Sequence, residues 1–455
     1  MTTEWQRVQP IFIDHSQQLN SIYNSSTKST HFRTPSELFL SFIPFETLAG
    51  IAEATNCNYF KTTQNKTVSK RNKHYKSLSE SDIRRYIGVT IFMGINRLPS
   101  YKMHWSSQMT TSPCITGAMT YNEFVRIGTW LKLSHKPFPK DMQKIEILAE
   151  SLQKTIKDLA PGTSYYCIDE SVIAFKGRHK LKQYLPMKPN KWGFKVFLLC
   201  NSLSGYVHKF SIFTGGEKFK PFRITKELTR DLEGVHLATD NWYSSVKLLE
   251  ELKAQGILCT CTIKKSARGF PPDYSSVCKT LKHKEFCFWQ KKGLLLVAYK
   301  DKALVNCITT HSSSPTVVNK KGTSKPECIV IYNQVMKGVD QFDQNMSYYL
   351  YSHRFSKWWK NCMIYLIEIA IYNSYVLYKG SNSVSYLQFR IELAYQLAKS
   401  TSVKEAIVTQ HKMVFSTKKK KCQFCKIRAK DSSTQYTCQE CQVALHKKCF
   451  ENYHS

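Results

Sequence analysis

The spacing of apolar residues divides the chain into four stretches, and the first, residues 1–135, carries helical periodicity. Apolar positions recur every three or four residues over 34–55 and again over 77–95. The first of these segments begins at Thr34-Pro35, a helix-start signal, and the second has Ser79 or Ser81 as its N-cap. We therefore expect a mainly helical region before residue 135.

From about residue 160 to residue 263 the pattern changes to short apolar runs typical of strands, with two amphipathic helices between them. The expected strands are 165–169, 193–201, 206–213, 234–240 and 257–263, and the expected helices are 224–232 and 244–256. Three consecutive strands followed by helix, strand, helix and strand is the order of a ribonuclease-H-like mixed sheet. In that order the first and fourth strands lie side by side.

The sheet pattern stops at Ile263, and residues 264–328 are Lys-, Ser- and Pro-rich loops around short hairpin-like pieces such as 286–300. We expect an insertion domain here that projects from the sheet without adding a strand to it. Helical periodicity resumes over 329–400, the second part of the core, and a compact module follows at 405–455. The apolar run at 361–378 is short for a membrane span and contains Glu368 and Asn373, which predicts a buried helix.

The charge balance points to a polyanionic partner. The chain has 66 Lys and Arg against 33 Asp and Glu, a formal net charge of +33. Such a surplus favours nucleic acid, because each neutralised phosphate releases condensed counterions. The basic residues are spread along the whole length rather than gathered beside an apolar anchor, which disfavours a membrane surface. A generally basic soluble protein is the alternative on charge alone.

Four aspartates stand where the predicted elements bring carboxylates together. Asp169 ends the first strand, Asp240 ends the fourth, and Asp340 and Asp343 share one face of a helix at 333–345. Gathered carboxylates repel one another unless a hard cation lies between them, and Mg²⁺ prefers oxygen ligands. Two such ions suit an in-line phosphoryl transfer. Taken singly, Asp169 and Asp240 read equally well as turn or helix-cap residues.

The same stretches resemble the piggyBac family of cut-and-paste DNA transposases over nearly the whole chain. The matching segments are 92–105, 169–195, 238–245, 332–344 and 352–375. By resemblance, Asp169, Asp240 and Asp340 match the catalytic aspartates, Asp343 matches a further acidic metal-site position, and 1–135 contains a dimerisation and DNA-binding region. The chain departs from many relatives at Lys337, where they have glycine, and in its very short N-terminal extension.

The resemblance implies a nuclear enzyme that acts as a homodimer on double-stranded DNA with two Mg²⁺ ions per active site. It would nick transposon ends with an activated water, form hairpins with the freed 3′-hydroxyl, and join the ends at TTAA targets without DNA synthesis. The alternative is a domesticated DNA-binding protein that keeps the fold and has lost transposition. The intact aspartates favour the enzyme.

Two basic tracts interleaved with aromatic residues are candidate DNA contacts. The first follows Asp169 and contains Lys176, Arg178, Lys180, Lys182, Lys188, Lys191 and Lys195, with Tyr184 and Trp192 among them. The second contains Arg354, Lys357 and Lys360. Cations at these positions suit phosphate contacts, and an aromatic ring suits an unpaired base. A solvated loop is the alternative for the first tract, and packing of Trp358 and Trp359 against the sheet is the alternative for the second.

The last stretch has the spacing of a zinc module. Of the sixteen cysteines, five lie in the last 35 residues, in the order Cys422-x2-Cys425, Cys438-x2-Cys441 and His446-x2-Cys449, followed by His454. In a cross-brace the first and third pairs share one Zn²⁺ ion, and the second pair takes His454 and, as eighth ligand, His411. The family's terminal cysteine-rich domain has this form and reads DNA. A peptide-reading finger is the rival, although Lys418 to Lys421 favour DNA and nuclear import.

Overall fold

A ten-stranded mixed sheet forms the centre of the molecule. The computed structural model describes residues 4–14, 34–63, 75–106, 112–312, 314–320, 323–351, 355, 357–380, 382–399, 413–422, 425, 432–438 and 443–454. The strands lie in the order β1-β9-β10-β11-β8-β7-β3-β5-β4, with β6 paired to β5. Their bounds are β1 Gln6–Val8, β3 Tyr165–Ala174, β4 Gln183–Tyr184, β5 Trp192–Asn201, β6 Val207–Ile212, β7 His236–Thr239, β8 Leu258–Thr262, β9 Phe286–Lys291, β10 Leu294–Lys300 and β11 Leu304–Thr309.

The ribonuclease-H-like part of the sheet has the predicted order. β3, β5 and β6 are consecutive antiparallel strands, and β7 and β8 add in parallel on the other side of β3. β3 and β7, the first and fourth strands, are therefore neighbours, as expected. The prediction that the first strand ends at Asp169 is wrong, because β3 pairs with β5 as far as Ala174 and Gly193.

The segment 264–328 does not stand apart from the sheet, which corrects the expectation of a projecting insertion domain. β11 pairs antiparallel with β8, and the β9–β10 hairpin continues the sheet beyond it. A free β8 edge would expose unpaired backbone groups, and β11 pairs with them. β1 pairs with β9 at the far edge, so the first residues also belong to the sheet and not to a helical region.

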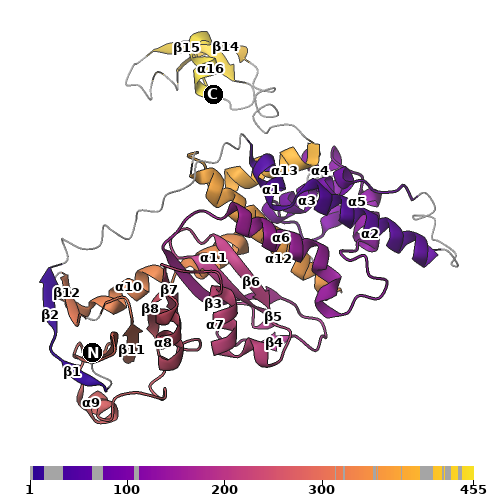
Figure 1. Ribbon diagram of the computed structural model, residues 1–455. Helices are drawn as coiled ribbons and strands as arrows, with labels where there is room; N and C mark the ends of the chain where they lie inside the picture. Colours follow the sequence, from indigo (N-terminus) through magenta and orange to yellow (C-terminus); the bar gives the residue numbers. More distant parts are fainter. Residues whose placement is uncertain are drawn as a thin grey trace.

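The two faces of the sheet carry different layers. On one face lie α7 (Pro221–Thr229) and α8 (Val246–Ala254), which bury leucines against Ile168 and Leu237. On the other face lie α10 (Glu327–Val335), α11 (Gly338–Tyr349) and α12 (Trp358–Lys379), around Cys167 and Ala238. Figure 1 shows the two sets of helices on opposite sides of the strands. Alternate residues of β3 therefore face different layers.

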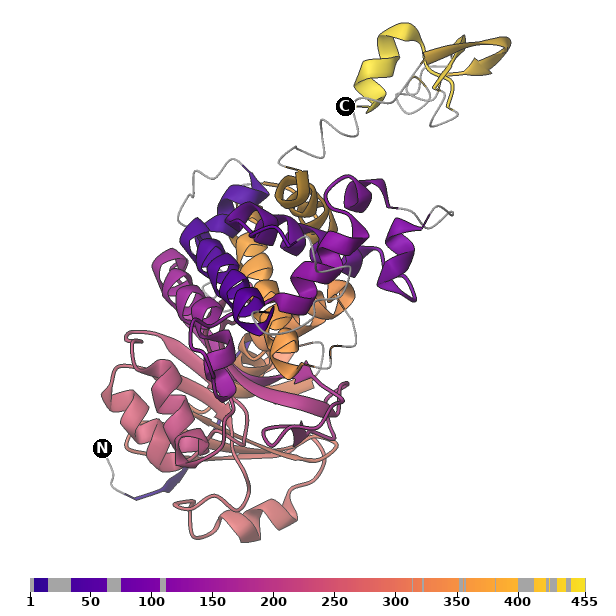
Figure 2. The ribbon, with the colours of Figure 1, turned by 90° about the vertical axis from the view of Figure 1, so that its right-hand side faces the viewer.

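The predicted helical region packs against helices from the other end of the chain. Its helices are α1 Pro35–Phe42, α2 Phe45–Thr63, α3 Glu80–Ile95, α4 Pro113–Thr116 and α5 Tyr121–Trp130, and α6 (Glu146–Leu159) follows beyond the predicted bound. α1 begins after the Thr34 N-cap as predicted, but the segment 34–55 is interrupted at Pro44, whose ring nitrogen has no hydrogen to donate. α3 packs against α13 (Tyr386–Lys399), and α1 packs against α12. Figure 2 shows these indigo and orange helices side by side.

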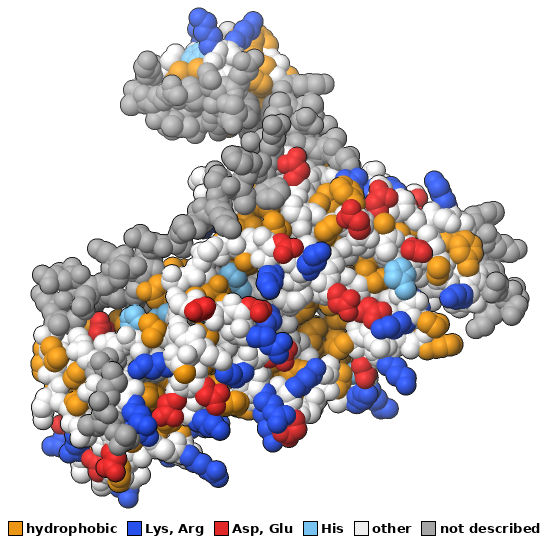
Figure 3. Space-filling view, viewed as in Figure 1, with side chains coloured by type: hydrophobic (Ala, Val, Ile, Leu, Met, Phe, Trp, Pro, Cys, Tyr) orange, Lys and Arg blue, Asp and Glu red, His pale blue; other side chains and the backbone are white. Residues whose placement is uncertain are grey.

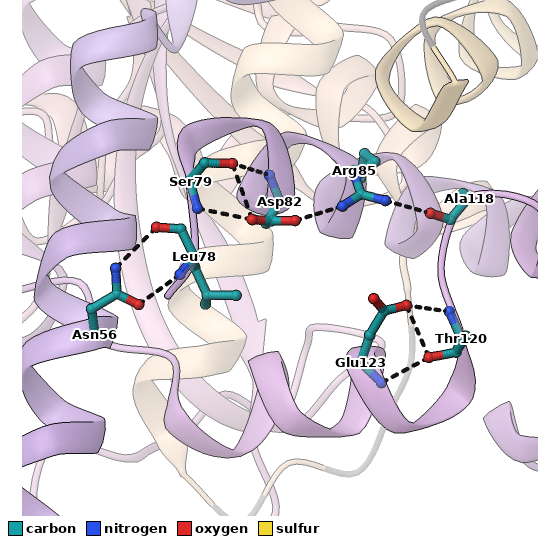
Figure 4. A network of polar contacts seen from close by, with 8 residues as sticks. All are labelled: Asn56, Leu78, Ser79, Asp82, Arg85, Ala118, Thr120 and Glu123. Carbon is teal, nitrogen blue, oxygen red and sulfur yellow. Dashed lines mark hydrogen bonds and ion pairs between the residues drawn. The ribbon is translucent and has the colours of Figure 1, made fainter. Parts of the chain in front are cut away.

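Short-range side-chain bonds fix the start of α3. Ser79 caps the helix in a capping box with Asp82, which confirms one of the two predicted caps. Arg85 then joins the Asp82 carboxylate at 2.5 Å to the backbone oxygen of Ala118 at 2.9 Å (Figure 4). The second capping box visible there begins α5. These contacts connect α3 to the segment before α5.

The polar residues inside the predicted buried helix at 361–378 each have a partner. Within α12, Glu368 forms an ion pair with Arg390 of α13, and both side chains are almost fully buried. The amide of Asn373 bonds both backbone groups of Val207 at 2.8 Å. Among the described helices, none is by itself long and apolar enough to span a membrane, and α1 and α2 reach the required composition only as a pair bent by 65°.

Three further groups of elements complete the described structure. A small sheet joins β2 (Ile11–Asp14), β12 (Thr316–Lys320) and β13 (Thr323–Pro326). α9 (Tyr274–Thr280) precedes the β9–β10 hairpin, and short 3-10 helices lie at Tyr101–Trp105, Asp141–Ile145 and Glu217–Phe219. The C-terminal unit contains the hairpin of β14 (Met413–Lys421) and β15 (Ser433–Cys438), followed by α16 (Lys447–His454).

Candidate functional site

Asp169 and Asp240 occupy matching positions on neighbouring parallel strands. Ile168 of β3 pairs with Thr239 of β7, and each aspartate is the next residue in its strand direction. Neighbouring strands are about 4.8 Å apart, so the two carboxylates start from adjacent backbone positions. The negative charge of Asp240 contributes to raising the pKa of Asp169. The strand register thus brings these two residues together, in the way that the order of the strands predicts.

Helix α11 is docked against the same face of β3 at two points. At its first residue, Gly338, an added Cβ atom would lie 2.3 Å from the Asn201 backbone oxygen and 2.8 Å from Cys167 Sγ, so only glycine permits this approach. Further along the helix, the Ser171 hydroxyl donates to the Asp343 carboxylate at 2.5 Å. Cys167 and Ser171 flank Asp169 on its own strand, and the helix therefore runs past it.

The remaining predicted carboxylate, Asp340, lies in the first turn of α11 and is exposed. Its charge acts on the buried Asp343, three residues later. Within the described residues, no group of three or more acidic side chains, with or without Asp340, has all its oxygen ligand atoms within 4.8 Å of one another. We call Asp169, Asp240, Asp340 and Asp343 together the acidic edge; the strand register brings the first two together, and α11 carries the other two.

Burial makes these carboxylates unusually weak acids. It raises the pKa of Asp169 to about 7, with further increases from the charges of Glu170 and Asp240. It also raises the pKa of Asp343 to about 6 and that of Asp240 above its ordinary value. Such a set of oxygen donors has the chemistry that Mg²⁺ prefers, because a cation would remove the cost of their shared negative charge.

One lysine already supplies positive charge to this cluster. The Lys188 ammonium donates to the backbone oxygen of Glu170 at 2.5 Å, and its charge lowers the pKa of both Asp169 and Asp343. Lys188 lies in the turn between β4 and β5, so this turn folds back onto the acidic edge. Lys188 is predicted from the sequence as a DNA contact, and its contact with the acidic cluster is not evident from the residue types alone.

Glu170, the second acid of the Asp-Glu pair, has a separate role because alternation turns it to the opposite face of β3. There it accepts a hydrogen bond from the Tyr243 hydroxyl at 2.8 Å and faces the Lys195 ammonium at 3.6 Å. Lys195 is half-buried over the Trp242 ring, 4.2 Å from its centroid, and burial lowers its pKa. These contacts hold the segment after Asp240 against β3, a function that the residue types alone did not reveal.

Comparison with known proteins places this chain in a family. A family model described as Transposase IS4 matches residues 34–375. The human "PiggyBac transposable element-derived protein 3" is 24% identical over 475 residues, covering 94% of this chain and 77% of that protein. The chain belongs to the piggyBac transposase family. The human "PiggyBac transposable element-derived protein 2" is 22% identical and covers 83% of this chain and 71% of its own length.

The fold is that of a solved piggyBac transposase. The structure "Cryo-EM structure of piggyBac transposase synaptic complex with hairpin DNA (SNHP)" aligns with a TM-score of 0.72 at 19% identity, over 93% of this chain and 98% of that one. The expected mixed α/β fold class is therefore confirmed, and the likeness at this identity concerns the fold alone.

The predicted DNA-contact residues of this piggyBac family member lie mostly on the surface. The exposed ones are Lys176, Arg178, Lys180, Lys191 and Lys357, while Arg354 lies outside the described residues. Lys182 is half-buried, with its ammonium 4.8 Å from the Trp192 ring centroid. Figure 3 shows Lys and Arg side chains dispersed over the visible face, with Asp and Glu among them. The cationic surplus is therefore spread out on this side.

The tryptophans of the second tract belong to the core. Trp358 and Trp359 are buried, and the Trp358 ring lies 5.3 Å from Phe194 of β5 and 4.6 Å from His179. This favours the packing alternative for these two residues. Lys360 is directed inward as well, donating to the backbone oxygen of Gly128.

The C-terminal unit gathers the first predicted ligand set. The ligand atoms of Cys422, Cys425, His446 and Cys449 all lie within 4.8 Å of one another. His446 Nδ1 is 3.5 Å from Cys425 Sγ, whereas Nε2 is 3.1 Å from the Ser433 backbone oxygen. A proton on Nε2 satisfies that oxygen and leaves the Nδ1 lone pair facing the sulfurs, as a metal ligand requires. The cluster fits a zinc finger.

The second predicted ligand set is only partly visible. Cys438 is buried at the end of β15. Cys441 and His411 lie outside the described residues, and the side chain of His454 is outside them as well. The pairing of these four residues stays a prediction.

Proposed function

We propose that this protein is a cut-and-paste DNA transposase whose active site is the acidic edge formed by Asp169, Asp240 and Asp340, with Asp343 beside them. The observation that carries the proposal is the register of β3 and β7, which gives Asp169 and Asp240 adjacent starting points. Their weak acidity supports a role as Mg²⁺ ligands, two ions being the number suited to phosphoryl transfer. Bound Mg²⁺ would stabilise the negative charge on the attacking and leaving oxygens.

The chain's own residues position this chemistry. Gly338 brings the first turn of α11 against β3, and the Ser171–Asp343 bond holds the next part of the helix. Lys188 offers a cation at the edge of the carboxylates, where a substrate phosphate would approach. On the opposite face of β3, the Tyr243–Glu170 hydrogen bond holds the loop after Asp240 in place. The result is a fixed set of acids with a cation beside them, suited to strand cleavage and strand transfer.

Several finer features complete the proposal. The substrate is double-stranded DNA, bound by the exposed cations Lys176, Arg178, Lys180 and Lys191, and the formal net charge of +33 favours such a partner. The enzyme acts as a homodimer in the nucleus and joins ends at TTAA. The matched transposase structure is a synaptic complex with hairpin DNA, which supports the same class of substrate here.

The C-terminal unit would bind Zn²⁺ through Cys422, Cys425, His446 and Cys449, and a second ion through Cys438, Cys441, His454 and His411. The Nδ1 orientation of His446 supports the first site. So short a segment folds on metal ligation rather than on a core of its own. Its lysines, among them Lys419 to Lys421, suit contact with the transposon end.

An excision and integration assay tests this function. Cells would carry a plasmid in which the DNA flanking this protein's coding region brackets a marker. The proposal expects marker excision and rejoining at TTAA tetranucleotides, both dependent on the full-length protein. Binding to the flanking DNA without any strand breakage would contradict it and favour the domesticated alternative, which the name "transposable element-derived" of the human relatives also suits.

A further inference from the structure

A small cavity with a mixed apolar and polar lining lies beside the catalytic carboxylates, between helix α10 and strands β8, β10 and β11. We call it the edge pocket. Its volume is about 100 Å³. The residues that give it chemical character are Thr262, Tyr299, Asp301, Lys325, Tyr332 and Asn333. None of these has a part in the proposed cleavage.

The strand register places the edge pocket in the row of the carboxylates. Thr239 of β7 pairs with Cys261 of β8, so Asp240 and Thr262 are the next residues on parallel strands. Thr262 in turn pairs with Cys307 of β11, which also lines the pocket. With about 4.8 Å between strands, the pocket begins one strand beyond Asp240.

The pocket and the carboxylates also share one face of the sheet. Cys167 and Ala238 precede Asp169 and Asp240 by two residues and therefore share their face of the sheet, and both pack in the same cluster as Ile331 of α10. Cys307 packs with Ile329 of that helix. Helix α10 therefore covers the pocket and leads directly into α11, which carries Asp340.

Two phenol rings give the pocket an aromatic character. Thr262 donates to the Tyr332 hydroxyl at 3.4 Å, which holds that ring over β8. Burial raises the pKa of the Tyr332 phenol, and the charges of Asp240 and Asp169 add to the increase, so this ring is within the field of the active site. The second ring, Tyr299, is buried, with the Lys325 ammonium 6.0 Å from its centroid.

The polar lining matches a nucleotide better than a metal ion. Asp301 and Asn333 are exposed and offer a carboxylate and an amide, the groups that read base edges. Lys325 offers a cation for a phosphate. Asp301 is the single acid among the lining residues, and the lining also contains the cationic Lys325. A divalent cation needs several anionic oxygens. Aromatic rings stack on any base.

We propose that the edge pocket receives one unpaired nucleobase of the DNA strand held at Asp169 and Asp240, stacked against Tyr332 and contacted by Asn333, with Lys325 on the adjoining phosphate. This inference rests on the proposed function, since it takes DNA as the substrate. It assigns the pocket a role in choosing the nucleotides next to the cleaved phosphate.

An abasic scan of the bound DNA tests the proposal. The full-length protein would be titrated with duplexes from the flanking DNA, each lacking the base at one position near the junction. The wild type should bind one of these duplexes about ten-fold more weakly, because a stacked base contributes about 1–3 kcal/mol. Tyr332→Ala, which removes the stacking ring, should lose this sensitivity while its affinity for that abasic duplex stays at the wild-type value, and Asn333→Ala should reduce the sensitivity.

Lys325→Ala should weaken binding of every duplex, and Lys302→Ala, an exposed lysine in the neighbouring turn, serves as its matched control. Thermal denaturation of each variant checks that the fold is kept. The proposal is overturned if no position is sensitive, or if Tyr332→Ala keeps the wild-type profile. Because the readout is binding, a sensitive position in a protein that never cleaves DNA would refute the proposed function and leave this inference standing. Absence of all DNA binding would refute both.

Discussion

At the scale of single residues, Asp169 lies in a strand in which the neighbouring residues are buried on both faces of the sheet. Burial and the charges of Glu170 and Asp240 raise its pKa to about 7. The sequence predicted the Asp169–Asp240 pair because parallel strands in this order bring their ends together. It did not predict that Ser171 holds Asp343 or that Lys188 returns to the acidic edge, because those contacts depend on how α11 and the β4–β5 turn dock.

The raised pKa of Asp169 has a consequence for stability. In metal-free protein the folded state keeps this proton up to about pH 7, whereas the unfolded chain releases it near its ordinary pKa of 3.8. Between these values the folded state binds more protons, so the contribution of Asp169 to the free energy of unfolding falls as pH rises. Asp169→Asn removes that loss.

We therefore predict that the Tm of Asp169→Asn minus the Tm of the wild type grows by a few degrees from about pH 5 to about pH 8 in chelator. The same measurement with Asp158→Asn, an exposed aspartate of α6, should give a flat difference. Excess Mg²⁺ should raise the Tm of the wild type more than that of Asp169→Asn. A pH-independent difference for Asp169→Asn would mean that its carboxylate is not buried as described.

At the scale of elements, the strong local patterns were sufficient for β3, β5, β6, β7 and β8 and for the buried helix α12. They failed where a strand finds its partner far along the chain. β11 pairs with β8 and β1 pairs with β9, and neither pairing leaves a mark in the local sequence. The Lys- and Ser-rich segment 264–328 around a hairpin predicts a projecting insertion domain, although its strands complete the edge of the sheet. Pro44 similarly breaks a helix that apolar periodicity alone would continue.

The docking of α11 gives a prediction about one glycine. Gly338→Ala would place a Cβ atom 2.3 Å from the Asn201 backbone oxygen and displace the helix that carries Asp340 and Asp343. We expect strand cleavage to fall by at least about ten-fold with DNA binding retained. In Gly50→Ala, the matched change in α2, the nearest atoms would be 3.6 Å and 3.7 Å away, so activity should be unchanged. Equal activity of the two variants would contradict this account of α11.

The buried ion pair between α12 and α13 gives a second prediction at this scale. Glu368→Gln leaves the fully buried Arg390 guanidinium without its counter-charge, and breaking such a pair costs about 3–5 kcal/mol. Denaturant unfolding should show a loss of this size, whereas Glu46→Gln on the surface of α2 should change little. Replacing both members by methionine should restore much of the stability. A mild effect of Glu368→Gln would indicate that the pair is solvated.

At the scale of the whole molecule, the C-terminal unit has its own sheet and its own ligand cluster. The spacing of its cysteines predicted the first ligand set because metal chemistry fixes the pattern. If Zn²⁺ binding and folding are coupled there, a chelator should unfold this unit and leave the large sheet intact. Two separate thermal transitions, one sensitive to chelator, are the expected result in calorimetry.

The matched variants are Cys425→Ser within the cluster and Cys57→Ser, an exposed thiol of α2. The first should abolish the chelator-sensitive transition and bind less Zn²⁺ in metal analysis, and the second should do neither. If chelator instead lowers the stability of the large sheet, or if Cys425→Ser keeps the full zinc content, the cluster is not the metal site inferred here.

The central claim is that Asp169 and Asp240 carry out metal-dependent strand cleavage. Its most direct measurement is the nicking of end-labelled duplexes from the flanking DNA by full-length wild type, Asp169→Asn, Asp240→Asn and Asp158→Asn, with and without Mg²⁺. The account predicts Mg²⁺-dependent cleavage that falls by about three orders of magnitude or more in the first two variants, is unchanged in the third, and is accompanied by equal DNA binding in all four proteins. Cleavage that persists in Asp169→Asn or Asp240→Asn would contradict it.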